Sequence, residues 1–382
     1  MAHLKVLLLG GLLCGKTSLL ASLFHSMTHG MTSEYLSACD KTPLEAKDGD
    51  WEYSLTGKRL ELEYFISKGK NNTFLAEKRL GHIFSKYVLQ LQIPGTDKRM
   101  EIEFLDVPGS FLQNEKIHLM EIISFVNESD IIVVVVDTPY LMVGSKEIAE
   151  AANAIDTILT LLMQVDCHET EKAKQILFVP VKCEKWVKEG KIDNVSEKVE
   201  EMYHPIIRDF RSSYKNELSI IPVETAGDIL FSELKDPYVL FNQKTQSQII
   251  CAKLSDRIVL LSDGKVRKIT EDEIIINDPC SVFRLCDDGK CFNRPKAWFH
   301  LRNEPKAVFS PHNCEQILLH IIRFMYKKKK SEYSSFIIER RPTFFGNISL
   351  NDIENLLGRL SRANLIKDNK EGIKNLYQFS SY

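Results

Sequence analysis

The stretch LLLGGLLCGKTSLL, residues 7–20, decides the fold class of this chain. It contains the pattern G-x-x-x-x-G-K-[ST] from Gly10 to Thr17, which binds phosphates when it joins a strand to a helix. The apolar run Leu4–Leu9 before it is strand-like, and Ser18–Phe24 after it is helix-like. We therefore interpret the segment as a phosphate-binding loop that opens an α/β domain.

The residue types of this loop suit phosphate binding. Its glycines let backbone N–H groups approach an anion, and the N-terminus of the following helix adds positive potential. We expect Lys16 to reach the β- and γ-phosphates of a nucleotide and the Thr17 hydroxyl to ligate Mg²⁺. The predicted phosphate-binding residues are Gly10, Gly11, Leu12, Leu13, Cys14, Gly15, Lys16, Thr17 and Ser18.

The apolar start of the chain also has the character of a secretion signal, with Cys14 as a lipidation site. However, Leu13 stands directly before Cys14, where a processing site needs a small residue. The nine cysteines are scattered and give no disulfide framework, which is typical of reduced thiols. The longest apolar runs, Ile131–Val136 and Ile317–Ile322, are too short to span a membrane. We therefore expect a cytoplasmic protein.

The composition limits the function only loosely. A chain of 382 residues with 44% hydrophobic residues can form two or three domains with large buried cores. The 50 basic and 52 acidic residues nearly cancel, so the global charge predicts neither nucleic-acid nor membrane binding.

A second motif lies in MEIEFLDVPGS, residues 100–110. Residues 100–105 alternate polar and apolar, as in a strand with one exposed face, and Asp106-Val107-Pro108-Gly109 follows. An Asp at the end of a strand beside a phosphate loop is placed to face a metal ion. Gly109 can offer its N–H to a γ-phosphate. The segment YVLQLQIPGTDKRMEIEFLD, residues 87–106, predicts a β-hairpin that ends in this motif.

Further strands and helices alternate along the chain. Strands are expected in SDIIVVVVDTP, in QILFVPV and in LSIIPVETAGD, and helices over residues 151–164 and within KVEEMYHPIIRDF. This alternation predicts a doubly wound, mostly parallel sheet.

These motifs together resemble a P-loop GTPase of the Ras-like, translation-factor-related (TRAFAC) superclass. Gly10–Thr17 matches the first motif of that family and Asp106–Gly109 the third. Val181–Glu184 falls where the family has N/T-K-x-D, and Glu224–Ala226 falls at the S-A-K-like motif. The resemblance implies that GTP or GDP and Mg²⁺ are bound. More loosely, VPVKCEKW and SPHNCEQILLHII are similar to the bacterial double-GTPase-like group of conflict and defence operons, some of which serve antiviral defence.

The resemblance also implies how the base would be bound. Lys182 would pack along the guanine plane, Glu184 would accept hydrogen bonds from guanine N1 and N2, and the backbone of Ala226, beside Thr225, would meet O6. Glu in place of Asp and Val181 in place of Asn or Thr depart from the family pattern. The alternative is that Glu184 and Lys185 are solvated charges after a strand.

The catalytic and switch residues are less regular. Ser110 stands where fast Ras-like enzymes have a Gln that orients water, and Gln113 is interpreted as an ordinary loop residue. We therefore expect slow intrinsic hydrolysis that a partner or a dimer completes. For the switch threonine that closes on Mg²⁺ we expect Thr73, with Thr32 and Thr42 as alternatives. The expected catalytic set is thus Lys16, Thr17, Asp106, Gly109 and Thr73, with Thr17, Asp106 and Thr73 on the metal.

The rest of the chain predicts additions to this domain. We divide it into a G domain core at 1–228 with an insertion at about 25–86, a β-rich insertion at 229–308, a closing helix at 309–330 and a tail at 331–382. Within the first insertion, RLELEYFIS predicts an extra strand. Ser262–Lys265 predicts a hairpin turn. The closing helix is expected over Pro311–Lys327 with Ser310 as N-cap.

The tail is predicted as a winged-helix-like unit. SLNDIENLLGRLSRANL is an amphipathic helix capped by Ser349, and residues 366–379 suit a two-stranded wing. Cys280, Cys286 and Cys291 lack the tight pairing typical of zinc sites, so we interpret them as ordinary thiols.

The leading hypothesis is a GTP-binding switch that contacts a protein partner or a second copy through the β-rich insertion or the tail. Nucleic-acid binding is the less favoured partner hypothesis, and no membrane contact is expected. The alternatives are an ATPase of the same fold and a nucleotide-binding scaffold or nucleic-acid-binding regulator without turnover.

Overall fold

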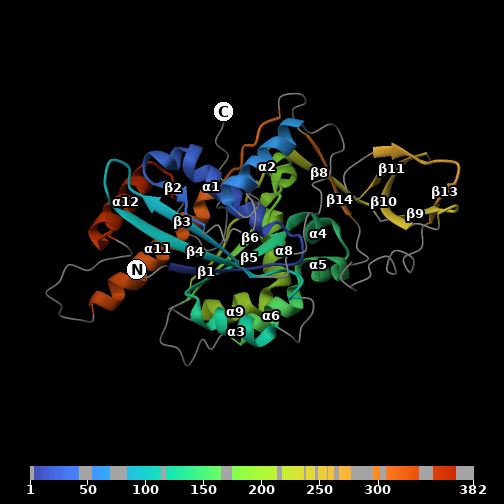
Figure 1. Cartoon of the computed structure of the whole chain (residues 1–382). Helices are drawn as coiled ribbons and strands as arrows, with labels where there is room; N and C mark the ends of the chain where they lie inside the picture. The colour runs from blue at the N-terminus through green and yellow to red at the C-terminus, as the bar shows by residue number, and fades with distance from the viewer. Residues whose placement is uncertain are drawn as a thin grey trace.

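A central sheet with helices on both faces organises this chain (Figure 1). The computed structural model describes residues 4–42, 54–68, 84–112, 118–164, 174–212, 217–235, 238–245, 248–255, 257–261, 266–276, 296–301, 307–334 and 347–366. In chain order, the strands of this sheet are β1 (Leu4–Leu9), β2 (Ser37–Asp40), β3 (Ser85–Gln92), β4 (Arg99–Asp106), β5 (Ile131–Asp137), β6 (Gln175–Val181) and β7 (Glu217–Ile220).

The strand order is β2-β3-β4-β1-β5-β6-β7, and the strands from β4 to β7 are parallel. β3 and β4 form the predicted hairpin, in which Ser85 pairs with Asp106, and β2 adds antiparallel to β3. β5 and β6 are buried along their whole length, as their continuous apolar runs predict. The predicted α/β class with a mostly parallel sheet is thus confirmed.

Twelve named helical segments are described with this sheet, most of them against its faces. They are α1 (Lys16–His29), a short helix at Met31–Glu34, α2 (Leu55–Lys68), α3 (Leu119–Glu128), α4 (Thr138–Val143), α5 (Lys146–Asn153), α6 (Ile155–Met163), α7 (Glu184–Lys188), α8 (Ile192–Met202), α9 (His204–Ser212), α11 (Glu315–Ser334) and α12 (Leu350–Arg362).

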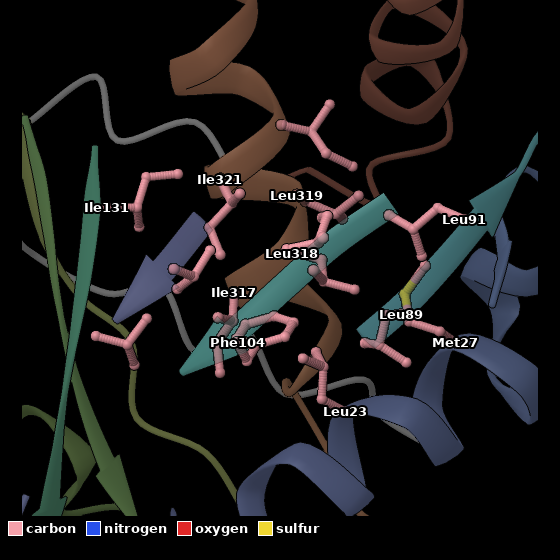
Figure 2. Close-up of a cluster of buried hydrophobic side chains, with 14 of the residues drawn as sticks. Leu23, Met27, Leu89, Leu91, Phe104, Ile131, Ile317, Leu318, Leu319 and Ile321 are labelled. Atoms are coloured by element: carbon pink, nitrogen blue, oxygen red, sulfur yellow. The ribbon is translucent and has the colours of Figure 1, made fainter. Parts of the chain in front are cut away.

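The two faces of the sheet hold separate cores. On one face, α1, α11 and α12 cover the sheet, and Figure 2 shows Leu23 and Met27 of α1 and Ile317 of α11 around Phe104 of β4. On the other face, α3, α6 and α9 cover residues that alternate with the first set, such as Leu7 of β1 (Figure 1). Because successive strand residues point to opposite faces, one strand serves both cores.

The described part of the tail joins the first core. Ser349 caps α12 as predicted, since its side chain accepts from the Asp352 N–H while the Asp352 carboxylate accepts from the Ser349 N–H. Ile353 and other apolar residues of α12 are buried in the same cluster as the central strands. The residues predicted to form the wing lie outside the described residues after Ile366.

Residues 229–308 contain strands, as predicted. β8 (Ile229–Lys235) pairs antiparallel with β14 (Lys296–Leu301). Between them a second sheet has the order β12-β11-β10-β9-β13 and stands away from the central sheet in Figure 1. Its strands are β9 (Tyr238–Asn242), β10 (Gln248–Ser255), β11 (Ile258–Leu261), β12 (Val266–Lys268) and β13 (Glu273–Ile276). The predicted turn at Ser262–Lys265 lies outside the described residues, and antiparallel β11 and β12 flank it.

Two helix and strand predictions were wrong. RLELEYFIS lies in helix α2, not in a strand, because Leu55, Leu62 and Ile66 form a buried helical face. Leu60 and Tyr64 of the same helix are exposed. The single helix predicted over residues 151–164 is divided into α5 and α6 by Ala154, which has a left-handed φ of 50°.

Two helix boundaries also differ from the prediction. The region KVEEMYHPIIRDF contains the end of α8 and the start of α9, with Tyr203 between them. The closing helix α11 begins at Glu315, and Ser310 is not its N-cap. Instead, the segment before α11 pairs with the loop after β7, where Gly227 bridges to Phe309 and Glu224 to His312.

Candidate nucleotide-binding site

The predicted phosphate loop joins β1 to α1, so the strand–loop–helix context is confirmed. Leu13 and Gly15 have left-handed φ values of 60° and 107°, which turn the chain sharply before the helix. Gly15 is the N-cap residue of α1, and its carbonyl accepts from the Leu19 N–H at 2.8 Å. A glycine suits this position because it takes a positive φ without steric cost.

Gly109 brings the second motif directly onto this loop. A Cβ atom placed on Gly109 would collide with the backbone N and Cα atoms of Leu12. The Val107 N–H also donates to the Leu8 carbonyl at 3.2 Å. The Asp106–Gly109 motif and the phosphate loop therefore lie in backbone contact.

Lys16 folds back over the phosphate loop. Its ammonium donates to the carbonyls of Gly10 at 3.0 Å and Gly11 at 3.4 Å, and its Nζ lies 3.9 Å from Asp106 Oδ1. The side chain is 8% exposed. The Lys16 ammonium is thus held over the loop by backbone carbonyls, close to where the loop would hold an anion.

Asp106 and Thr17 offer oxygen ligands side by side. The Thr17 hydroxyl donates to Asp106 Oδ2 at 3.1 Å. Asp106 Oδ1 is buried and accepts no hydrogen bond. Burial raises the pKa of Asp106, while Lys16 and the Thr17 hydroxyl lower it. A buried carboxylate oxygen without a hydrogen-bond donor, next to a hydroxyl, matches the hard oxygen ligands that Mg²⁺ prefers, so the residues fit this ion.

Lys182 and Glu184 follow β6, which is separated from β1 in the sheet by β5. Lys182 has a left-handed φ of 62°, and its Cε lies 3.6 Å from the position of a Cβ on Gly15. Its ammonium pairs with Asp137 Oδ2 at 2.6 Å. The lysine side chain therefore runs past the end of the phosphate loop.

Glu184 connects the loop after β6 to the segment after β7. Its Oε1 accepts from the N–H groups of Ala226 at 2.8 Å and Gly227 at 3.3 Å. Burial, followed by repulsion from Glu224, raises the pKa of Glu184 to about 7. The Ser22 hydroxyl donates to the Thr225 carbonyl at 2.6 Å, which ties the same segment to α1. Glu184 is therefore not the solvated charge of the alternative interpretation.

The sheet topology brings these parts to one edge. β1, β4 and β6 are parallel. The phosphate loop follows the carboxyl end of β1, Asp106 is the last residue of β4, and Lys182 follows β6. The loop with Thr225 and Ala226 follows β7 in the same direction. Such an edge is where open α/β sheets bind ligands.

Thr73, the expected switch residue, lies outside the described residues. Thr32 is buried beyond the far end of α1, about 20 Å along the helix from Thr17. Thr42 accepts from the Val88 N–H at the outer edge of the sheet. Ser110 is buried, and Gln113 lies outside the described residues.

The described residues hold no group of three His, Cys, Asp or Glu side chains placed to bind a metal ion. The three cysteines at 280, 286 and 291 lie outside them. Within the same described ranges, no helix has the length and apolar character needed to cross a bilayer.

The sequence motifs missed two residues of this edge, Asp137 and Asn153. Asp137 ends β5 and is almost fully buried, and Asn153 ends α5 and accepts from the Asp137 N–H at 2.6 Å. The available signal was the Asp at the end of a continuous apolar run, which places a carboxylate at the same sheet edge as Asp106.

Comparisons with known proteins give distant matches. No protein-family model matches the chain, and a search of curated proteins finds no match. Among solved structures, the chain is similar to the signal recognition particle receptor SRb-GTP/SRX complex from Chaetomium thermophilum, with 13% identity and a TM-score of 0.32 over 60% of this chain and 93% of that chain. It is also similar to Sup35 complexed with GMPPNP, with 10% identity and a TM-score of 0.26 over 79% of this chain and 64% of that chain. TM-scores this low carry no functional argument, so the function rests on the residues of the site.

Proposed function

We propose that this chain binds GTP with Mg²⁺ at the sheet edge formed by the ends of β1, β4 and β6, and hydrolyses it slowly. The observation that supports the proposal is the convergence of Lys16, Thr17 and Asp106 beside the loop that carries Lys182 and Glu184. A phosphate-binding loop alone fits any nucleoside triphosphate. The second loop adds groups suited to bind a base.

The phosphate end supplies charge and metal ligands. Lys16 would leave the carbonyls of Gly10 and Gly11 for the β- and γ-phosphates, and the loop N–H groups would hold the same anion. Thr17 and Asp106 would hold Mg²⁺, Thr17 directly and Asp106 directly or through water. When bound, Mg²⁺ neutralises charge that develops on the phosphate oxygens.

The base end supplies a carboxylate. Glu184, when ionised, can accept from two N–H donors, which guanine offers at N1 and N2 and adenine does not. The Lys182 stem lies against Gly15, so it can follow the base plane while its ammonium stays with Asp137. These contacts favour guanine over adenine.

Slow hydrolysis follows from the residue after the second motif. Ser110 is buried in place of a side chain that could reach and orient a water molecule. An arginine or a water-orienting group from a protein partner or a second copy would complete the site. The five-stranded sheet β12-β11-β10-β9-β13 is the surface that we propose for such a partner.

One observation favours a second candidate, a nucleotide-binding protein that does not select guanine. Glu184 Oε1 already accepts from two backbone N–H groups, including that of Ala226. If this arrangement persists when a nucleotide is bound, the base would meet fewer selective groups and ATP would bind as well as GTP.

Isothermal titration calorimetry distinguishes these candidates. Wild-type protein is titrated with GTP, GDP and ATP in the presence of Mg²⁺. We expect GTP and GDP to bind and ATP to bind at least tenfold more weakly, about 1.4 kcal/mol. Lys16→Ala should abolish binding, while Lys5→Ala, an exposed lysine on β1, should not change it. Equal affinity for GTP and ATP would favour the second candidate, and no binding of either would reject both.

A further inference from the structure

An ion pair behind the candidate site joins two neighbouring strands. The Lys182 ammonium lies 2.6 Å from Asp137 Oδ2, and the exposed fractions of the two side chains are 18% and 2%. Asp137 ends β5, and in the sheet it is the direct partner of Val181, the residue before Lys182. The other oxygen, Asp137 Oδ1, is buried and accepts no hydrogen bond. Lys182 is therefore the cation that offsets this buried charge.

Asn153 fixes the backbone at Asp137. Its Oδ1 accepts from the Asp137 N–H at 2.6 Å, and its Nδ2 donates to the Ala149 carbonyl at 3.1 Å. Asn153 is completely buried at the end of α5, where the left-handed Ala154 redirects the chain. The side chain thus holds the end of β5 in a fixed position relative to α5.

The same junction also contacts the phosphate loop. The carbonyl oxygen of Ala152 lies against Gly11 so closely that a Cβ on Gly11 would collide with it. Lys182 passes the other end of this loop at Gly15. α5 and β5 therefore contact the phosphate loop at Gly11 and Gly10, and Lys182 contacts it at Gly15.

Stability alone gives a weak reason for this pair. Replacing a buried ion pair by apolar residues is often neutral or stabilising, because removing two charges from water is costly. Val181, directly before Lys182, has no polar side-chain group that could tie the loop to its neighbours. Lys182 itself has a left-handed backbone conformation that a non-glycine residue rarely adopts.

We propose that Asp137 and Asn153 are positioning residues for the base end of the nucleotide site. Asp137 holds the Lys182 ammonium, Asn153 holds Asp137, and the lysine stem is thereby kept where the base plane would lie. This inference rests on the proposed binding of a guanine nucleotide. In this proposal, β5 and α5 order the base-binding loop, although neither element contains one of the sequence motifs.

The test compares a ligand that has a base with one that does not. The affinities for GDP and for inorganic tripolyphosphate are measured by calorimetry, and the melting temperature of each variant is recorded. Asp137→Asn should weaken GDP binding by about tenfold, because a hydrogen bond to a charged group is lost. Tripolyphosphate binding should change by less than about twofold. Asn153→Ala should give a smaller loss in the same direction.

Two further variants separate positioning from general stability. In a Lys182→Met background, Asp137→Asn should no longer affect GDP binding, because the two residues act through one contact. Asp130→Asn is the matched control. It breaks a 2.7 Å pair with Lys328 at the opposite end of β5 and should leave both affinities unchanged.

Three outcomes are informative. Wild-type GDP affinity that is retained in Asp137→Asn would overturn this inference and leave the proposed function standing. Equal losses for GDP and tripolyphosphate together with a lower melting temperature would assign the pair a structural role and also overturn it. Wild-type protein that binds neither ligand would reject the proposed function itself.

Discussion

The two ends of the candidate site differ in how completely their polar groups are paired. At the phosphate end, Asp106 Oδ1 accepts no hydrogen bond. The Lys16 ammonium is held by backbone carbonyls, and its Nζ lies 3.9 Å from Asp106 Oδ1. At the base end, the Lys182 ammonium is paired with Asp137 Oδ2, and Glu184 Oε1 accepts from two backbone N–H groups. Asp137 Oδ1 is the exception there, since it is buried and accepts no hydrogen bond. The phosphate end therefore retains bonding capacity for a ligand, whereas much of the base end is bonded within the protein.

This difference indicates separate contributions to binding. A buried carboxylate oxygen without a donor is costly, and a bound cation can remove that cost. A base-binding loop that is already held in place loses little entropy when a ligand binds. The phosphate end would thus supply most of the affinity, and the base end most of the choice between nucleotides.

The largest expected effect tests the phosphate end. Asp106→Asn should weaken Mg²⁺-dependent GTP binding on the order of a hundredfold, because a charged metal ligand is lost. The melting temperature should stay the same or rise, since burial disfavours the ionised carboxylate in the folded chain. Calorimetry with and without Mg²⁺ and a thermal melt measure both quantities.

A stable Asp106→Asn protein with unchanged Mg²⁺-dependent affinity would contradict the assignment of Asp106 to the metal. A large fall in melting temperature would show that the carboxylate serves the fold, and the contrast between the two ends would then be lost.

The next effect tests the backbone contact within the phosphate end. Gly109→Ala places a Cβ into the backbone of Leu12, so it should lower the free energy of unfolding by about 1–3 kcal/mol and displace the phosphate loop. GTP affinity should fall with it. Denaturant unfolding and calorimetry are the measurements. Gly358→Ala is the control, because Gly358 lies in helix α12 and has open space where the Cβ would be. Gly95→Ala is not used as a control, because Gly95 has a φ of 76° that strains an alanine.

A pH effect tests the base end. Burial and Glu224 raise the pKa of Glu184 from 4.5 to about 7 in the folded chain. The folded state therefore binds this proton more tightly than the unfolded state, and the stability from this group is lost as the pH rises from 4.5 through about 7. Glu184→Gln should remove this slope from the free energy of unfolding, measured by denaturation at several pH values.

The same titration affects nucleotide binding. Because the ionised carboxylate accepts from guanine, GTP affinity should increase as the pH rises through about 7 in wild-type protein but not in Glu184→Gln. Glu189→Gln is the control, since Lys191 lowers the pKa of that exposed carboxyl. A pH profile of GTP affinity that is identical in wild type and Glu184→Gln would rule out contact between Glu184 and the base.

The sequence indicated the backbone arrangement of the phosphate loop more directly than the contacts around Lys182 and Glu184, for a physical reason. Gly10–Thr17 and Asp106–Gly109 are local patterns in which a few neighbouring residues fix the backbone and the chemistry. Asp137 and Asn153 matter through contacts between separate elements, which no spacing in the sequence encodes. The expected base end therefore comprised only Lys182, Glu184, Thr225 and Ala226.

The errors in secondary structure have similar causes. The strand predicted at RLELEYFIS failed because burial of Leu62 and Ile66 against other helices selects a helix over a short alternating pattern. The start of α11 was misplaced because the preceding segment pairs with Glu224–Gly227, far away in the chain. Local propensity could not anticipate that pairing.

The smallest expected effect lies outside both ends. Gly358→Ala in α12 should raise the free energy of unfolding by about 0.5–1 kcal/mol, because alanine favours a helix and nothing lies within 4 Å of the new Cβ. GTP affinity should not change. Coupled denaturation and calorimetry would show whether stability and binding are independent; a change in affinity would mean that α12 communicates with the site.

The most direct test of the central claim is a crystal structure of the protein with Mg²⁺ and a non-hydrolysable GTP analogue. We expect the phosphates in the Gly10–Thr17 loop, the ion beside Thr17 and Asp106, and the guanine against Lys182 with its N1 and N2 facing Glu184. The structure would also identify the threonine that closes on the ion. A nucleotide bound elsewhere, or a base turned away from Lys182 and Glu184, would contradict the account.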